Sequence, residues 1–377
     1  MKTLIFKIFL LGAIVFVLSS CEKRDYNLGR SVQDTVKTYG LTSAKAVDMV
    51  LIYKGGVQRP EWTVDEFMPY VSYMDPETNE ENWLYDGFLF LEFADGTGRS
   101  FTAPVKEDPN NKATRKVEWE GLLNSQFASN RGIDALDKAI TQKSSQLGAP
   151  KRKRKVVIGL PEPWPGQKDW GALNGVALNF SSQNDRLNAV KWYVDEIVRR
   201  WAVLNPLNLE LAGFYWVPES AYISQVMLPT LKSYITTKGN FTFYHIPHWG
   251  AMLRDSWTKL GFDISYQQPN VYFHSERIVS VKEVIDYGKQ RGHSFEFEFD
   301  ENIMKARNNA DKRGRFLEYF NEYESNGIFE SYPLTYYQSH FAWSVLVKSA
   351  DVEDMELSKK LGRKIVERQK KADNATN

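Results

Sequence analysis

The sequence has little cysteine and no excess of either charge. Cys21 is the only cysteine among 377 residues, so no disulfide can form within the chain. Lys and Arg together number 48 against 47 Asp and Glu, and this balance provides no field that would hold nucleic acid. The basic run Lys151–Lys155 leads into an apolar stretch, so we expect it at a solvated rim opposite the strand ends. No nucleic-acid partner is expected.

Several catalytic and cofactor motifs are also missing. The chain has no Gly-x-Ser-x-Gly, no Gly-x-x-x-x-Gly-Lys-Ser/Thr and no Gly-x-Gly-x-x-Gly after an apolar stretch. The fragment Gly96-Thr-Gly98 is too short to count as a phosphate loop. The sequence therefore gives no support to a nucleophilic serine elbow or a nucleotide site, and we expect no cofactor.

The N-terminal residues have the pattern of a secretion signal. Apart from Lys7, residues 4–18 are apolar, and Leu18-Ser-Ser-Cys21 follows them. This pattern resembles a bacterial lipobox, which implies removal of residues 1–20 and acylation of Cys21. We then expect a tether over residues 21–45 and a lipid anchor in the bacterial cell envelope. The alternative is an ordinary signal peptide with a chance cysteine.

The remaining chain alternates between apolar strands and amphipathic helices. Residues 155–160 are almost continuously apolar, which is typical of a parallel strand covered on both faces. Four expected helices end at a glycine that leads directly into a strand (Gly239, Gly261, Gly292 and Gly327). Helices are expected at 64–73, 125–147, 185–204, 224–238, 254–260, 280–291, 310–324 and 341–349. Eight strands are expected, at 47–53, 88–93, 155–160, from 209, 241–245, 262–266, from 293, and 328–332.

This alternation predicts an α/β protein with a (β/α)8 barrel over residues 46–350. Residues 351–377 are expected to form a charged C-terminal helix and tail. An open, doubly wound sheet is the alternative architecture. In a barrel of this kind the carboxyl ends of the strands form the working face, so polar residues at those ends are the candidates for chemistry.

The seventh expected strand has acids on one face and phenyl rings on the other. Phe295, Phe297 and Phe299 alternate with Glu296, Glu298 and Asp300. The phenyl face should meet the helices, so the acids should face the barrel interior. Desolvating such charges without partners costs several kcal/mol each, roughly, so one or more should be functional. The alternative for Glu296 is a salt bridge with an interior Lys or Arg.

A second acid, Glu219, follows the fourth strand. It comes after Trp216-Val-Pro218, and an acid beside an indole has its charged form disfavoured, which suits a proton donor. The alternative is that Glu219 caps the helix that follows.

These residues resemble the large clan of barrel glycoside hydrolases that have an acid/base after strand four and a nucleophile after strand seven. The resemblance implies that Glu219 is the acid/base and Glu298 the nucleophile of a retaining enzyme acting on a poly- or oligosaccharide, with the carboxyl groups about 5 to 5.5 Å apart. Pro218 stands where that clan usually has Asn, so Gln267, Asn270 or His245 would have to contact the sugar 2-hydroxyl.

The chain from about residue 45 to about residue 350 also resembles a family of lipid-anchored barrel proteins of polysaccharide-degrading bacteria, known as a domain of unknown function. Phe214-Tyr-Trp216 with Glu219, and the acids of the seventh strand, carry this resemblance. Further residues near strand ends are expected to bind the sugar: Lys54, Glu162, Trp164, Tyr215, Trp216, His245, His248, Trp249, Gln267, Asn270, Glu296, Asp300 and Tyr332.

Two rival functions remain open at this point. The barrel could bind glycans without cleaving them. Alternatively, His245 and His248 could hold zinc in a hydrolase or deacetylase, although Pro247 prevents their presentation on a helix. Our main interpretation includes no metal site.

Overall fold

The computed structural model describes residues 39–104, 111–274 and 279–375. The expected signal peptide and Cys21 lie outside the described residues, so lipid anchoring stays a prediction, as do the domain boundaries. Among the described residues, no helix has the length and apolar character needed to cross a membrane.

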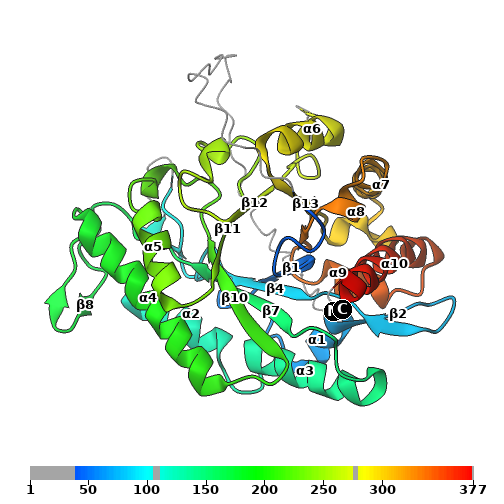
Figure 1. Ribbon diagram of the computed structural model, residues 1–377, viewed down its shortest axis with the longest axis horizontal. Helices are drawn as coiled ribbons and strands as arrows, with labels where there is room; N and C mark the ends of the chain where they lie inside the picture. Colours follow the sequence, from blue (N-terminus) through cyan, green and yellow to red (C-terminus); the bar gives the residue numbers. More distant parts are fainter. Residues whose placement is uncertain (1–38, 105–110, 275–278, 376–377) are drawn as a thin grey trace, which may run out of the picture. The chain divides into compact units, whose positions relative to one another are not determined.

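Within these residues, eight parallel strands close into a barrel in the order β1-β14-β13-β12-β11-β10-β7-β4 (Figure 1). The first barrel strand, β1, pairs in parallel with the last one, β14, and with the second one, β4, and these pairings close the ring. The predicted (β/α)8 fold is confirmed. The strands are β1 (Asp48–Tyr53), β4 (Gly87–Leu91), β7 (Arg154–Leu160), β10 (Leu209–Trp216), β11 (Thr242–His245), β12 (Ile264–Gln267), β13 (Ser294–Glu298) and β14 (Leu334–Tyr337).

Helices surround the barrel on its outer face (Figure 1). They are α1 (Val64–Val71), α2 (Lys116–Gln126), α3 (Gly132–Leu147), α4 (Gln183–Leu204), α5 (Leu228–Lys238), α6 (Val281–Arg291), α7 (Ala310–Ser325), α8 (Ile328–Ser331), α9 (Ala342–Val347) and α10 (Val352–Ala375). Short two-stranded sheets decorate the connections: β2 (Ser72–Met74) with β3 (Glu81–Trp83), β5 (Arg99–Ser100) with β6 (Lys112–Ala113), and β8 (Ala172–Leu173) with β9 (Val176–Ala177).

Side-chain alternation along β13 is as the sequence predicts. Phe297 packs edge-on against Phe316 and Tyr319 of α7, which places the phenyl face under the helices. Glu296 and Glu298 therefore face the barrel interior.

The eighth strand was predicted at the wrong residues. Residues 328–331 form the short helix α8, and the strand is Leu334–Tyr337. Gly327 adopts a left-handed conformation (φ 69°) and begins α8 rather than a strand. Consequently Tyr332 precedes β14 instead of ending it, and its ring lies 5.2 Å from that of Phe295 near the start of β13. Tyr337 is the residue that ends the strand.

The prediction of a single helix over residues 125–147 was also wrong. The structure has two helices, α2 and α3; Asn130 lies in the break between them and Gly132 begins α3, and both have positive φ (57° and 51°). The backbone N–H of Gly132 donates to the carbonyl of Trp62 instead of continuing a helix. Residue spacing alone did not show this tertiary contact.

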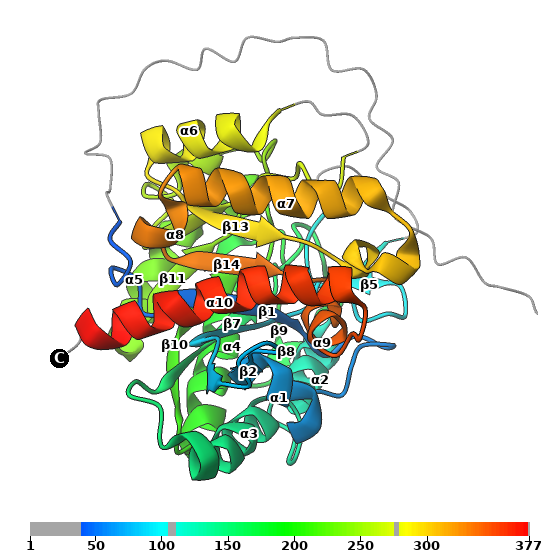
Figure 2. The same cartoon turned by 90° about the vertical axis from the view of Figure 1, so that its right-hand side faces the viewer.

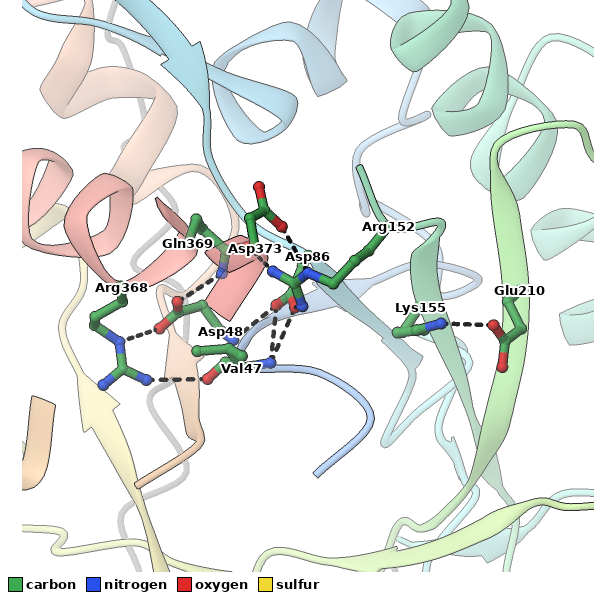
Figure 3. A network of polar contacts seen from close by, with 9 residues as sticks. All are labelled: Val47, Asp48, Asp86, Arg152, Lys155, Glu210, Arg368, Gln369 and Asp373. Carbon is green, nitrogen blue, oxygen red and sulfur yellow. Dashed lines mark hydrogen bonds and ion pairs between the residues drawn. The ribbon is translucent and has the colours of Figure 1, made fainter. Parts of the chain in front are cut away.

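The N-terminal ends of the strands form what we call the floor of the barrel, and a polar network holds it together (Figure 3). Asp48 of β1 accepts hydrogen bonds from Arg368 Nε and Gln369 Nε2 of α10, both at 2.7 Å. Asp86 accepts from Arg152 at 2.7 Å, which confirms that the basic run lies opposite the strand carboxyl ends. Figure 2 shows α10 running alongside β14 on the outside of the barrel, with its C-terminal end at the floor.

Candidate functional site

A cavity of about 280 Å³ lies at the carboxyl ends of the strands, which we call the mouth. Strand ends and the loops after them supply its walls, as expected for a barrel of this class. The lining residues are Leu51, Tyr53, Arg59, Leu91, Phe93, Tyr215, Glu219, Gln268, Asn270, Phe273, Glu296, Glu298, Tyr337, Ser339 and His340. The acids after strands four and seven thus reach one mouth cavity, although they are far apart in the chain.

Glu298 is the buried acid at the end of β13, with 1% of its surface exposed. Its Oε2 accepts a hydrogen bond from the Tyr319 hydroxyl at 2.5 Å, and the backbone of Asn270 provides a further hydrogen bond. Burial raises the pKa of Glu298 to about 8, against the opposing effect of these donors. The carboxyl group is therefore held by two donors, and among the described residues it forms no ion pair.

Glu296 lies two residues earlier on the same face and is also 1% exposed. Its Oε2 accepts from the Thr335 hydroxyl at 3.2 Å, and Thr335 is its register partner on β14. Burial, followed by the charge of Glu298, raises the pKa of Glu296 well above its usual range. An ion pair with an interior Lys or Arg, the alternative considered from the sequence, does not form among the described residues.

Glu219 extends into the mouth cavity from the loop after β10. Its Oε1 accepts from Gln268 Nε2 at 3.3 Å, and burial raises the pKa of its carboxyl group. Glu219 is not a helix cap, because the next helical turn (Tyr222–Ser224) begins after Ala221 without a side-chain cap. Trp216 alternates with the cavity-lining Tyr215 and does not line the cavity.

Side-chain amides stand near Glu219, where the resembled clan has an Asn. Gln268 donates to Glu219, and Asn270 Nδ2 in turn donates to Gln268 Oε1 at 3.2 Å. Of the three substitutes proposed from the sequence, only Asn270 lines the cavity. Gln267 instead donates to the carbonyls of Pro247 and Gln268.

Aromatic rings and one ion pair also line the cavity, and Tyr337 is the register partner of Glu298 on the adjacent strand. The rings of Tyr53 and Tyr337 meet edge-to-face at 6.0 Å, and Phe273, 42% exposed, meets Tyr337 at 5.3 Å. Arg59 forms a bidentate pair with buried Glu92, with Nε at 2.8 Å and a second nitrogen at 2.9 Å. Rings of this kind suit the apolar faces of sugars.

The sequence prediction missed several cavity residues, including Arg59, Gln268, Phe273, Tyr337 and His340. Gln268 directly follows β12, and its position next to a strand end was a usable signal. Tyr337 was missed because its strand was misplaced. Arg59, Phe273 and His340 lie in loops, where no periodicity indicates which way a side chain points.

Several predicted binding residues lie outside the cavity. Asp300 accepts from the Tyr272 hydroxyl at 2.7 Å and caps the turn Glu301–Ile303. Lys54 pairs with Glu61 at 3.5 Å. Trp249 packs under Arg254, whose guanidinium carbon is 4.4 Å from the ring centroid.

The loop after β7 likewise faces away from the cavity. Glu162 is buried, accepts from Ser224 and from the backbone N–H of Ala103, and has its pKa raised by burial to about 7. Trp164 is half-buried and outside the cavity lining. Trp170, in the same loop, packs edge-on against Trp119 at 5.3 Å, so local packing accounts for it.

The two histidines after β11 do not line the cavity either. His245 is buried and stacks on Phe262 at 4.5 Å, and burial lowers its pKa to about 3. His248 accepts from the backbone N–H of Gly250 at 2.9 Å. Over residues 39–104, 111–274 and 279–375, no group of three or more His, Cys, Asp or Glu side chains is arranged to hold a metal ion.

Comparison with protein families gives a match over residues 48–363 to DUF4855, described as a domain of unknown function. The chain belongs to the DUF4855 family. The match covers every strand of the barrel and the first half of α10, so it includes the mouth cavity, whereas Arg368 and Gln369 of the floor lie beyond it. The comparison with curated proteins found no match.

Solved structures resemble this DUF4855 barrel only distantly. One is a xylanase–α-amylase inhibitor protein in complex with trehalose, with 12% identity over 83% of this chain and 97% of that one, and a TM-score of 0.34. A second form of such an inhibitor has 11% identity over 84% of this chain and 98% of its own, with a TM-score of 0.36. The carboxyl transferase domain of Rhizobium etli pyruvate carboxylase has 10% identity over 70% of this chain and 41% of that one, with a TM-score of 0.32. At these TM-scores the likeness carries no argument about function.

Proposed function

We propose that this protein is a glycoside hydrolase in which Glu219 is the acid/base and Glu298 the nucleophile. The observation that carries the proposal is the presence of both carboxyl groups on one mouth cavity that aromatic side chains also line. The cavity volume of about 280 Å³ lies just below the roughly 300 to 1,000 Å³ typical of small-molecule sites. We therefore expect it to enclose one sugar ring, with the rest of the glycan outside.

In the retaining reaction, Glu219 protonates the leaving oxygen while the Glu298 carboxylate attacks the anomeric carbon and forms a glycosyl-enzyme. Glu219 then removes a proton from water, which displaces Glu298 and releases the sugar. Glu298 must be ionised for the first step. Since the pKa of Glu298 is raised to about 8, we expect a bell-shaped pH profile of kcat/KM whose ascending limb is shifted towards that pH, and whose descending limb reports loss of the Glu219 proton.

The products of azide rescue distinguish the two roles. In Glu298→Ala, azide should replace the nucleophile and give a glycosyl azide of inverted configuration. In Glu219→Ala, azide should attack the glycosyl-enzyme and give the retained configuration. NMR spectra of the products formed from a panel of glycans give the anomeric configuration of the glycosyl azide. The proposal would be contradicted if both variants turned over glycans at the wild-type rate, or if the wild type turned over none.

A glycan-binding protein without turnover is a second candidate, favoured by the raised pKa values of all three acids. A neutral carboxyl group can donate a hydrogen bond to a sugar hydroxyl but cannot act as an anionic nucleophile. This candidate predicts that glycan affinity survives Glu298→Gln and that the wild type releases no reducing ends.

We also propose that Cys21 carries acyl chains and anchors the protein in the cell envelope, which the lipobox-like pattern supports. Cells fed with a labelled fatty acid should incorporate the label into the wild-type protein and not into Cys21→Ser. Equal labelling of both proteins would rule out Cys21 as the anchor.

A further inference from the structure

The cations near the mouth cavity are already engaged by other groups. Arg59 is the guanidinium on the cavity wall, and Glu92 balances its charge through two hydrogen bonds. Glu92 also accepts from the backbone N–H groups of Gly56 and Phe93. Both members of this pair are thus satisfied without the three cavity acids.

Lys312 is near Glu298 but is also occupied. Its ammonium donates to the carbonyl of Tyr272 and lies 4.4 Å from the centroid of that ring. In the part of the chain that the structure describes, none of the three cavity acids forms an ion pair. Among the described residues, the mouth cavity thus has three carboxyl groups that no cation pairs with, since the one guanidinium in its lining, Arg59, is paired with Glu92.

Glu296 has no role in a mechanism that uses two carboxyl groups. It lines the cavity at 1% exposure, and the Thr335 hydroxyl is its hydrogen-bond partner at Oε2. Among the described residues, no hydrogen bond reaches its other oxygen, Oε1. Oε1 is not one of the fully enclosed atoms without a partner, so it has access to the cavity, where a donor group of a ligand can reach it.

We propose that the mouth cavity recognises a sugar with a free amine, and that Glu296 binds its ammonium group. This inference rests on the proposed function, which places the sugar in the cavity. An ammonium offers three donors, enough for Glu296 Oε1 and further acceptors in the cavity. The Tyr337 ring, which lines the cavity, can add attraction for a desolvated cation, whereas Arg59 already lies over the ring of Tyr53. An N-acetyl group removes the charge and the donors together.

The inference is tested with glucosamine and galactosamine oligosaccharides in both anomeric linkages, beside their N-acetylated counterparts and neutral hexose oligomers. Binding is measured by calorimetry at pH 6.5 in buffers of different ionisation enthalpy, and cleavage by release of reducing ends. The wild type should prefer the free-amine sugars at least 10-fold. Binding them should release protons, because the ammonium favours the ionised forms of the cavity acids.

Glu296→Gln keeps the shape of the side chain and should lose most of this preference without losing the fold. Glu162→Gln is the matched control, because Glu162 is equally buried just after β7, another strand of the barrel, but outside the cavity. The preference of this control variant for free-amine sugars should equal that of the wild type. The proton release of the wild type is a second readout that does not depend on either variant.

The outcomes separate the two proposals. Cleavage of neutral or N-acetylated glycans with no preference for free amines would overturn the inference and leave the glycosidase in place. A preference that Glu296→Gln retains would overturn the assignment of Glu296. Absence of binding and cleavage with every glycan would overturn the proposed function itself.

Discussion

The two ends of the barrel treat buried acids differently. At the floor, Asp48 is paired with Arg368 at 2.7 Å and also accepts from Gln369 and from the Tyr336 hydroxyl (Figure 3). At the mouth, Glu296 and Glu298 accept from hydroxyl groups, and no described cation pairs with them. The difference separates acids that hold the fold together from acids that remain available to a ligand.

The pKa directions follow from these partners. Burial raises the pKa of Asp48, but Arg368 opposes that rise, and the same contact raises the pKa of Arg368. At the mouth, burial raises the pKa of Glu296, and the charge of Glu298 raises it further. The pKa is raised at both ends, so ionising these acids costs stability as pH rises in both places, but Arg368 offsets part of that cost at the floor and we expect the larger penalty at the mouth.

The largest expected effect is at the floor. Arg368→Met leaves Asp48 buried without its cation and removes donors from the carbonyls of Val47 and Tyr332. We expect the free energy of unfolding to fall by about 3 to 5 kcal/mol, measured by urea denaturation. Lys155→Met is the control on the same side, because the Lys155–Glu210 pair is more exposed and should contribute less than about 1 kcal/mol. Equal losses in both variants would remove the distinction between paired buried acids and surface pairs.

The mouth should respond in the opposite direction. The pKa of Glu298 is raised in the folded state, so its contribution to stability is fully present below the unfolded pKa, roughly 4.3, and is lost as pH rises through about 8. Glu298→Gln should thus be close to neutral at pH 4 and stabilising at pH 8, by on the order of 3 to 4 kcal/mol. Urea denaturation at both pH values gives the comparison. Destabilisation at pH 8 would mean that Glu298 has a charged partner after all.

A smaller effect is expected when one hydrogen-bond donor to Glu298 is removed. Tyr319→Phe removes the hydroxyl that donates to Glu298, so the pKa of Glu298 should rise further, by about one unit. The pH dependence of the unfolding free energy would then extend to higher pH. Tyr323→Phe, one turn along α7, is the control, because that hydroxyl donates to the backbone carbonyl of Glu296 rather than to a carboxylate. Identical profiles for the two variants would contradict the assigned contact.

Sequence patterns predicted the barrel because side-chain alternation and apolar runs depend only on residues that are close together in the chain. Alternation along β13 predicted which side chains face inward, and apolar runs located most strands. The eighth strand was misplaced because Ile328–Tyr332 has the apolar character of a strand. Register with β1 and β13 instead selects Leu334–Tyr337.

The site was predicted less completely, for a physical reason. Glu219, Glu296 and Glu298 follow from strand order and alternation, so they converge as expected. His245, one residue from the strand-five position that faces inward, stacks on Phe262 under the helices. Arg59, Phe273 and His340 come from loops whose conformation depends on tertiary contacts, which sequence spacing does not encode.

The most direct test of the central claim is reducing-end release from a glycan panel by the wild type, Glu298→Gln and Glu162→Gln, assayed together. We expect Glu298→Gln to lower kcat by a factor on the order of 10³ or more, while Glu162→Gln stays within about threefold of the wild type. Activity that survives in Glu298→Gln, or that falls equally in both variants, would contradict the assignment of catalysis to the mouth cavity.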